Sequence, residues 1–170
     1  MDLHEFVAPF AEHLGSWSGS GRGYYPTIDG FEYTETLTFT GVPGKPFVKV
    51  EQKTASPAGA PMHVETGYLR FSATDHVELI LAQPTGQTEL LEGTYNPADG
   101  TLELTESRIV NSTTAKTVHE TQRFYTFNGD QLTTAFHMAA VGEAMTQHLE
   151  STLHRAEADR AEPGLAETHA

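Results

Sequence analysis

The sequence predicts an all-β protein built from one antiparallel sheet. Three observations support this class: about ten short β-rich runs, tight turn segments between them, and no helical stretches that would connect parallel strands. The runs are Gly15–Tyr25, Phe31–Phe39, Phe47–Thr54, His63–Phe71, Val77–Ala82, Gln87–Tyr95, Thr101–Glu106, Lys116–Phe127, Gln131–Val141 and Thr146–His154.

Closure of this sheet into a barrel is the expected outcome, because a closed barrel has no exposed edge strand. A barrel of roughly eight to ten strands has room inside for one ligand. A sandwich of two sheets is the alternative that the pattern leaves open.

The N-terminal segment carries a helical pattern. Apolar residues between Leu3 and Leu14 recur at three- and four-residue intervals, which predicts a short helix. Pro9 should break or kink this helix, and Gly15 should end it. After Trp17 a glycine stands at every second position as far as Gly23, which is the period of a strand.

The next run shows the alternation of a half-buried strand. Phe31, Tyr33, Leu37 and Phe39 alternate with glutamate and threonine, so one face should be apolar and the other wet. Turn-forming residues such as Asn128-Gly129-Asp130 punctuate the later runs.

The length and composition predict one folded domain. The chain has 170 residues, of which 38% are hydrophobic and 19% charged, as in an ordinary globular protein. We expect a single barrel domain over residues 1–155. Residues 156–170 lose periodicity and carry four acids against one arginine, so we expect a disordered acidic tail.

The charge and the absence of cysteine exclude several function classes. A net charge of −13 repels nucleic acid and anionic membranes. Without cysteine there are no disulfides, thiolate nucleophiles or cysteine-ligated metals, so a metal needs histidine, carboxylate or tyrosine. The N-terminus has no basic region typical of a secretory signal, and no apolar run reaches membrane-spanning length, so we expect a cytoplasmic protein.

A chain of motifs resembles the nitrobindin family. The first is the Gly-x-Trp-x-Gly-x-Gly pattern of Gly15 to Gly21, which continues to Tyr25-Pro26-Thr27-Ile28. Further matches follow in the family's order: Gly44-Lys45-Pro46-Phe47, Met62-His63-Val64-Glu65, Gly93-Thr94-Tyr95, Met138-Ala139-Ala140-Val141-Gly142 and Thr146-Gln147-His148-Leu149. The resemblance covers roughly residues 6 to 155.

This resemblance implies a ten-stranded antiparallel barrel similar to the fatty-acid-binding proteins, holding one ferric haem b near an open end. It also implies an enzyme that isomerises peroxynitrite to nitrate and reacts with nitric oxide, so the expected partners are small molecules. A homodimer is left open.

The resemblance places the axial iron ligand at His148, in the last strand, and neutral imidazole is a common haem ligand. The alternative reading of His148 is a surface histidine. His154 lies six residues on and would share its strand face, but it matches the end of the family's strand, so we expect it to face solvent.

Three further residues match positions near the family's haem. Thr27 would contribute to the pocket, although a threonine after Pro26 also suits a plain turn. His63 could donate a hydrogen bond to a bound anion or contact a propionate, unless it is a structural strand histidine. Lys116 could pair with a propionate, unless it is simply exposed.

The glycines Gly15, Gly19 and Gly21 and the indole of Trp17 are expected to serve the fold. Trp17 would plug the closed end, and the glycines would allow strands to bend or approach closely. Met138 is read as core filler rather than as an iron ligand.

Two other functions remain as alternatives. A carrier of a fatty acid would hold the carboxylate with buried arginine and tyrosine, for which Arg70, Arg123 and Tyr125 are candidates. A haem or nitric-oxide sensor would need a separate output protein. A serine hydrolase is disfavoured, because no Gly-x-Ser-x-Gly elbow is visible.

Overall fold

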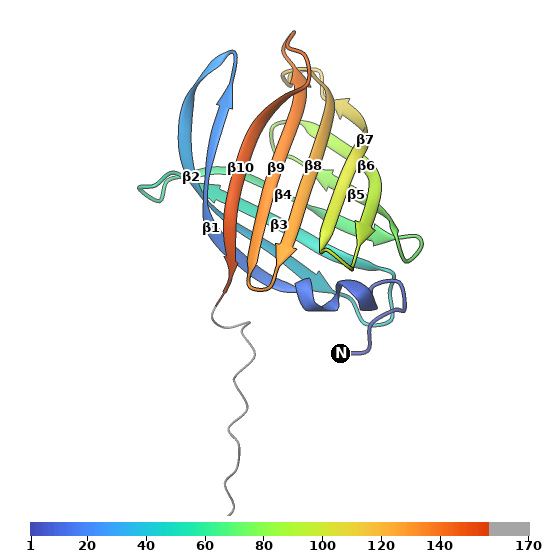
Figure 1. Ribbon diagram of the computed structural model, residues 1–170. Helices are drawn as coiled ribbons and strands as arrows, with labels where there is room; N and C mark the ends of the chain where they lie inside the picture. The colour runs from blue at the N-terminus through green and yellow to red at the C-terminus, as the bar shows by residue number, and fades with distance from the viewer. Residues whose placement is uncertain (157–170) are drawn as a thin grey trace, which may run out of the picture.

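The computed structural model describes residues 1–156, which form a closed barrel of ten antiparallel strands (Figure 1). The strands are β1 (Gly15–Tyr25), β2 (Ile28–Gly41), β3 (Phe47–Ala55), β4 (Pro61–Phe71), β5 (His76–Ala82), β6 (Gln87–Asn96), β7 (Thr101–Asn111), β8 (Val118–Asn128), β9 (Gln131–Ala140) and β10 (Thr146–Arg155). Each strand pairs with its neighbours in the chain, and β1 also pairs with β10. The predicted all-β barrel is confirmed, and the sandwich alternative is wrong. The predicted acidic tail beyond Ala156 lies outside the described residues.

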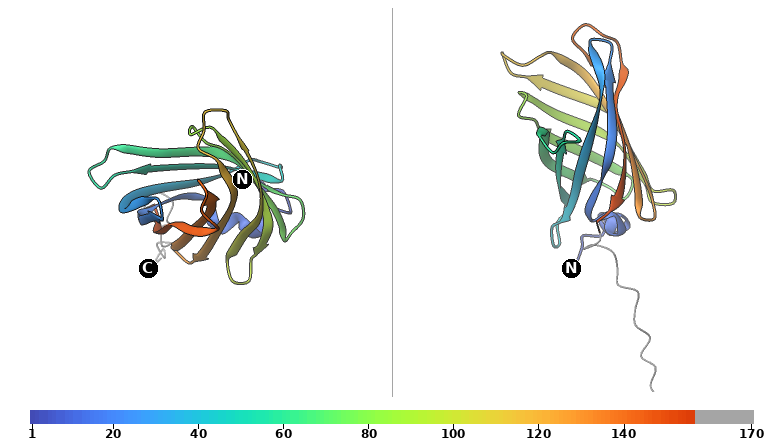
Figure 2. Two further views of the ribbon diagram at one scale, coloured as in Figure 1. Left: turned by 90° about the horizontal axis from the view of Figure 1, so that it is seen from above. Right: turned by 90° about the vertical axis from the view of Figure 1, so that its left-hand side faces the viewer.

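The N-terminal helix is shorter than predicted. It is a 3-10 helix over Ala8–His13 (η1) rather than a helix over Leu3–Leu14, and Pro9 stands in its first turn. Proline suits the first turn and not the interior of a helix, which explains why the helix begins here. Figure 2 shows η1 lying across one end of the barrel. No helix within residues 1–156 is long and apolar enough to cross a membrane.

An aromatic core closes the end of the barrel that η1 covers. Phe10 of η1 is fully buried and packs at centroid distances of 5.2 to 5.6 Å against four rings, those of Phe39, Phe71, Tyr95 and Phe127. Trp17 is also fully buried, and its Nε1 donates a hydrogen bond to the carbonyl of His13 at 3.0 Å. The hydrophobic core therefore fills this half of the barrel and leaves the opposite half for a ligand.

Strands β7 and β8 differ most from the prediction. β7 runs to Asn111 rather than Glu106, and β8 begins at Val118 rather than Lys116. Their backbone register covers only Thr101–Leu104 against Arg123–Thr126. Beyond it, side chains bridge the strands: Asn111 Nδ2 donates to the carbonyl of Val118 at 2.8 Å. The wall near the open end is thus held in part by side chains.

Candidate functional site

A cavity of about 590 Å³ occupies the open half of the barrel. This volume lies within the range of sites for cofactors and small molecules. The four residues predicted to hold a cofactor, Thr27, His63, Lys116 and His148, all line this one cavity. The structure thus brings together side chains from segments that are far apart in the sequence.

A β-bulge in β10 directs His148 into the cavity. Gln147 pairs with His137 of β9, and Leu149 pairs with Phe136, so His148 has no partner residue on β9. A bulge of this kind changes which face of the sheet the following residues occupy. As a result both His148 and Leu149 line the cavity.

The same bulge separates the two histidines of β10. Simple alternation places His154 on the face of His148, and this part of the prediction is wrong. After the bulge, Ser151 and Leu153 face the interior, while His154 is exposed, as expected. Only His148 of this pair can reach a ligand inside the barrel.

The His148 ring is held in a defined orientation by β1. Its Nδ1 lies 2.9 Å from the carbonyl oxygen of Tyr24, and because a carbonyl only accepts hydrogen bonds, Nδ1 carries the proton. Burial lowers the pKa of His148, and the hydrogen bond to Tyr24 opposes this only in part. The neutral ring therefore keeps the lone pair on Nε2, the arrangement typical of a metal-ligating histidine.

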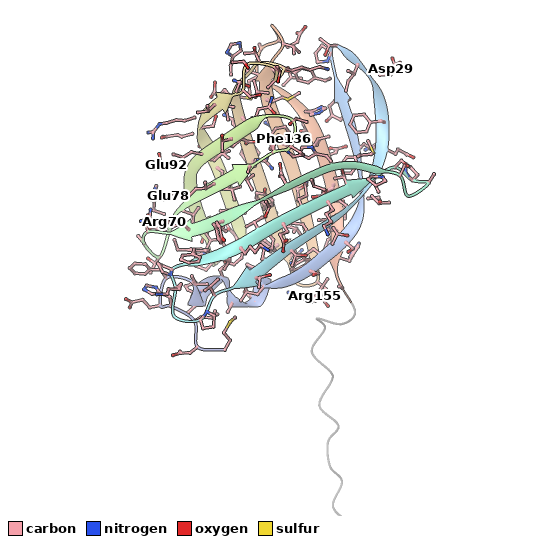
Figure 3. All side chains as sticks on the ribbon, turned by 180° about the vertical axis from the view of Figure 1, so that it is seen from behind. Asp29, Arg70, Glu78, Glu92, Phe136 and Arg155 are labelled. Atoms are coloured by element: carbon pink, nitrogen blue, oxygen red, sulfur yellow. The ribbon has the colours of Figure 1, made fainter. Side chains whose placement is uncertain are left out.

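Three aromatic rings, here called the aromatic collar, surround His148. Their centroids lie 5.4 Å (Tyr25), 6.2 Å (Phe31) and 6.2 Å (Phe136) from the imidazole. Phe136 is labelled in Figure 3, where it lies within the barrel. The hydroxyl of Tyr25 is fixed by donating to the carbonyl of Met138 at 3.2 Å. The collar gives this side of the cavity a largely apolar surface that suits a flat aromatic ligand.

Three charged residues, here called the charged floor, line the inner part of the cavity: Glu65, Glu89 and Arg123. Arg123 Nη2 lies 3.0 Å from Glu65 Oε2 and 2.8 Å from Glu89 Oε1, so one guanidinium bridges both carboxylates. Burial alone would raise the pKa of Glu65, but Arg123 and His63 together outweigh burial and bring that pKa to about 2. The two carboxylates likewise raise the pKa of Arg123, against the effect of its burial.

Glu35 lies beside the charged floor, but its pKa is shifted in the opposite direction to that of Glu65. It is buried, and its Oε1 accepts a hydrogen bond from Gln52 Nε2 at 2.8 Å. Burial raises the pKa of Glu35, and the hydrogen bond from Gln52 lowers it by less. An elevated pKa favours the neutral acid in this position.

The other predicted site residues differ in their surroundings. His63 contacts the charged floor, with Nε2 3.5 Å from Glu65 Oε2 and a side chain that is 31% exposed. Lys116 and Thr27 are exposed residues of the rim, and the Lys116 carbonyl accepts a hydrogen bond from Gln87 Nε2 at 2.8 Å. These positions suit contact with the outer edge of a ligand.

The glycine and tryptophan motif lies outside the cavity lining. Trp17 is buried in the aromatic core at the closed end, and the guanidinium of Arg155, which Figure 3 labels, lies 4.4 Å from the Trp17 ring centroid. Gly15 has a φ of 109°, which favours glycine. Gly19 and Gly21 stand where β1 approaches β10 closely.

Sequence reasoning missed the carboxylates of the cavity. Glu35 follows Tyr33 and precedes Leu37 at two-residue spacing, and Glu89 stands in the same way between Gln87 and Leu91. Each glutamate therefore falls on the inward phase of its strand. A carboxylate on an otherwise buried face was the available signal, because such groups are buried only when they are paired or neutral.

A closed barrel with a ligand-sized cavity and an oriented imidazole defines a β-barrel that binds a cofactor. The family model described as "THAP4-like, heme-binding beta-barrel domain" matches residues 7–155. The chain therefore belongs to this haem-binding β-barrel family, and its resemblance to the nitrobindins is confirmed.

Similar proteins carry names from the same family. The chain is 47% identical over 156 residues to a peroxynitrite isomerase of Nocardia farcinica, covering 90% of this chain and 92% of that protein. It is 44% identical over 157 residues to peroxynitrite isomerase 2 of Mycobacterium avium, covering 91% and 97%. The crystal structure of Rv2717c from M. tuberculosis matches with a TM-score of 0.86 at 42% identity, covering 91% of this chain and 99% of that one.

Proposed function

We propose that this chain is a peroxynitrite isomerase that holds one haem b, with His148 as the axial ligand of the iron. The observation that carries this proposal is the His148 ring, which is neutral, bonded through Nδ1 to the Tyr24 carbonyl and left with Nε2 free to bind a metal. The relatives named peroxynitrite isomerase, similar over nine-tenths of the chain, support the reaction.

The lining of the cavity fits a haem. The aromatic collar offers apolar contact beside His148, and its three rings come from β1, β2 and β9. At the rim, Lys116 would pair with a propionate and Thr27 would contact the edge of the cofactor. His63 would face the bound anion or a propionate. The contacts of the aromatic collar, Lys116, Thr27 and His63 with haem are all part of the proposal.

When bound, ferric haem supplies a Lewis-acidic and redox-active iron at which peroxynitrite can rearrange to nitrate. The residues of the chain supply the conditions for this reaction. His148 presents a neutral nitrogen donor, and the aromatic collar limits water around it. No acid–base pair is required, because the isomerisation consumes and releases no proton. Nitric oxide, a small neutral molecule, is proposed as a second ligand.

The partners proposed are small molecules. A net charge of −13 supports this, because it opposes association with nucleic acid and anionic membranes. A cytoplasmic location stays a prediction, and the homodimer stays open.

The proposal is tested by comparing haem-loaded wild type with His148→Ala. We expect the substitution to abolish the wild-type Soret spectrum and to reduce the nitrate yield from added peroxynitrite to that of free haem, because the iron loses its protein ligand. The matched control is His154→Ala, which removes an exposed histidine of the same strand and should leave both readouts unchanged. Equal behaviour of the two variants would refute the ligand assignment.

The structure weakens the fatty-acid-carrier alternative. Arg70, one of its candidate cations, lies on the outer surface, where it forms an ion pair with Glu78 (Figure 3). Arg123 is inside the cavity but is bonded to both Glu65 and Glu89. Among these candidates, neither arginine is left to bind a fatty-acid carboxylate.

A further inference from the structure

The charged floor is a buried set of ionisable side chains inside the cavity. Its three side chains are almost completely buried, with exposed fractions of 7% for Glu65, 2% for Glu89 and 6% for Arg123. They come from β4, β6 and β8, and all three line the cavity. Any ligand that reaches the inner end of the cavity therefore meets these groups with little water between them.

The donors of Arg123 are directed at carboxylate oxygens. Nη1 bonds Glu65 Oε1 at 2.5 Å, Nη2 bonds both glutamates, and Nε lies 3.3 Å from Glu89 Oε2. Glu89 receives further hydrogen bonds from Thr121 at 2.8 Å and from Gln83. The cation is thus enclosed by its partners, and it offers no open pair of donors to an incoming carboxylate.

The charge balance of the floor is negative. Both glutamates form ion pairs with Arg123, so the formal charges of the three groups sum to −1 in a buried region of low dielectric, where repulsion of a second anion is strong. Glu35 lies beside these charges: burial is the main cause that raises its pKa, while Glu65 raises it further and Arg123 lowers it. His63 also faces Glu65 and would offset this charge only when protonated.

We propose that Glu65 and Glu89 are specificity-determining residues that exclude carboxylate head groups from the inner cavity. With either glutamate neutralised, a buried arginine in an apolar barrel becomes a binding site for a long-chain carboxylate. In the native chain both glutamates are charged, so the site around Arg123 repels a long-chain carboxylate. This exclusion of carboxylates by the floor is separate from the ligation of haem by His148.

The experiment measures the affinity of oleate relative to oleyl alcohol, an uncharged ligand with the same chain. Both displace the neutral dye Nile red from the full-length chain without added haem, at pH 8. The ratio of the two affinities isolates the effect of the carboxylate, because the apolar contribution is common to both ligands.

The ratio should follow the formal charge of the floor. Wild type has a charge of −1, Glu65→Gln has 0, and Glu65→Gln with Glu89→Gln has +1, so we expect oleate to gain at least tenfold over oleyl alcohol across this series. The matched control is Glu65→Gln with Arg123→Gln, which changes two floor residues but keeps the charge at −1 and should keep the wild-type ratio.

A constant ratio across the series would overturn the proposal, as would a wild-type chain that prefers oleate. If the doubly neutralised variant does not fold, as judged by its far-ultraviolet circular dichroism, the single variants Glu65→Gln and Glu89→Gln still test the step from −1 to 0. The ratio is read without haem, so its outcome is independent of the haem spectrum that tests His148.

Discussion

His13 is an unusual polar residue at the closed end of the barrel. Its ring stacks on Phe127 at a centroid distance of 4.0 Å, and its buried Nε2 has no hydrogen-bond partner among the described residues. Burial, and secondarily the charge of Arg155, lower the pKa of His13 to about 4. The folded protein therefore keeps this ring neutral where an unfolded chain would protonate it.

This difference predicts a loss of stability in weak acid. Between pH 6.5 and 4 the unfolded state binds the proton and the folded state does not, so the free energy of unfolding falls as pH falls and levels off below pH 4. We expect a contribution on the order of 1–2 kcal/mol after solvent screening. His13→Phe keeps the stacked ring and should remove this contribution. Urea unfolding of both proteins at pH 7.5, 5.5 and 4 measures it, and parallel curves would contradict the assignment.

At the scale of elements, β1 is packed against β10 more closely than side chains allow. A Cβ atom at Gly19 would lie 2.1 Å from the carbonyl oxygen of Thr152, and one at Gly21 would lie 2.5 Å from the carbonyl oxygen of Glu150. These glycines hold β1 next to the strand that carries His148, and the Tyr24 carbonyl of β1 orients its ring. The glycine motif thus supports the site indirectly.

Gly19→Ala should therefore destabilise the barrel. Because the clash is with backbone, we expect a cost of about 2–4 kcal/mol, seen as a lower thermal midpoint. Gly30→Ala is the matched control, since a Cβ there meets its nearest atom at an ordinary 3.7 Å. Equal thermal midpoints for the two variants would show that the close approach does not constrain β1.

The bulge in β10 is the feature that the alternation of apolar and polar residues could not predict. The sequence Thr146 to His154 contains no glycine or proline to mark an irregularity. The register shift between Gln147 and Leu149 becomes visible only when β9 and β10 are paired. The family resemblance pointed to His148, which lines the cavity, whereas two-residue alternation also placed His154 on its face.

For the whole molecule, local signals were sufficient for the architecture. All ten strands were predicted near their observed positions, because alternation and turn residues are encoded within each run. Besides the bulge in β10, the differences lie at the ends of elements: η1 is shortened at Pro9, and β7 extends where it pairs with β6 alone. The pairing of β1 with β10 closes the barrel and leaves the sheet without an exposed edge strand.

The interior chemistry was less predictable than the fold. The charged floor joins Glu65, Glu89 and Arg123, which are at least 24 residues apart in the sequence and meet only across the barrel. Arg123 was considered as a holder of ligand carboxylates, but its glutamate partners were not foreseen. Placement of Thr27, His63, Lys116 and His148 around one cavity agrees with the resemblance, while their contacts with haem stay predictions.

The most direct test of the central claim is rescue of His148→Gly by imidazole. The substitution leaves a space beside the aromatic collar in which free imidazole can take the place of the missing side chain. We predict that the ferric haem spectrum of the variant differs from that of wild type and returns to it as imidazole is added. A His148→Gly variant whose spectrum equals that of wild type without imidazole would contradict ligation of the iron by His148.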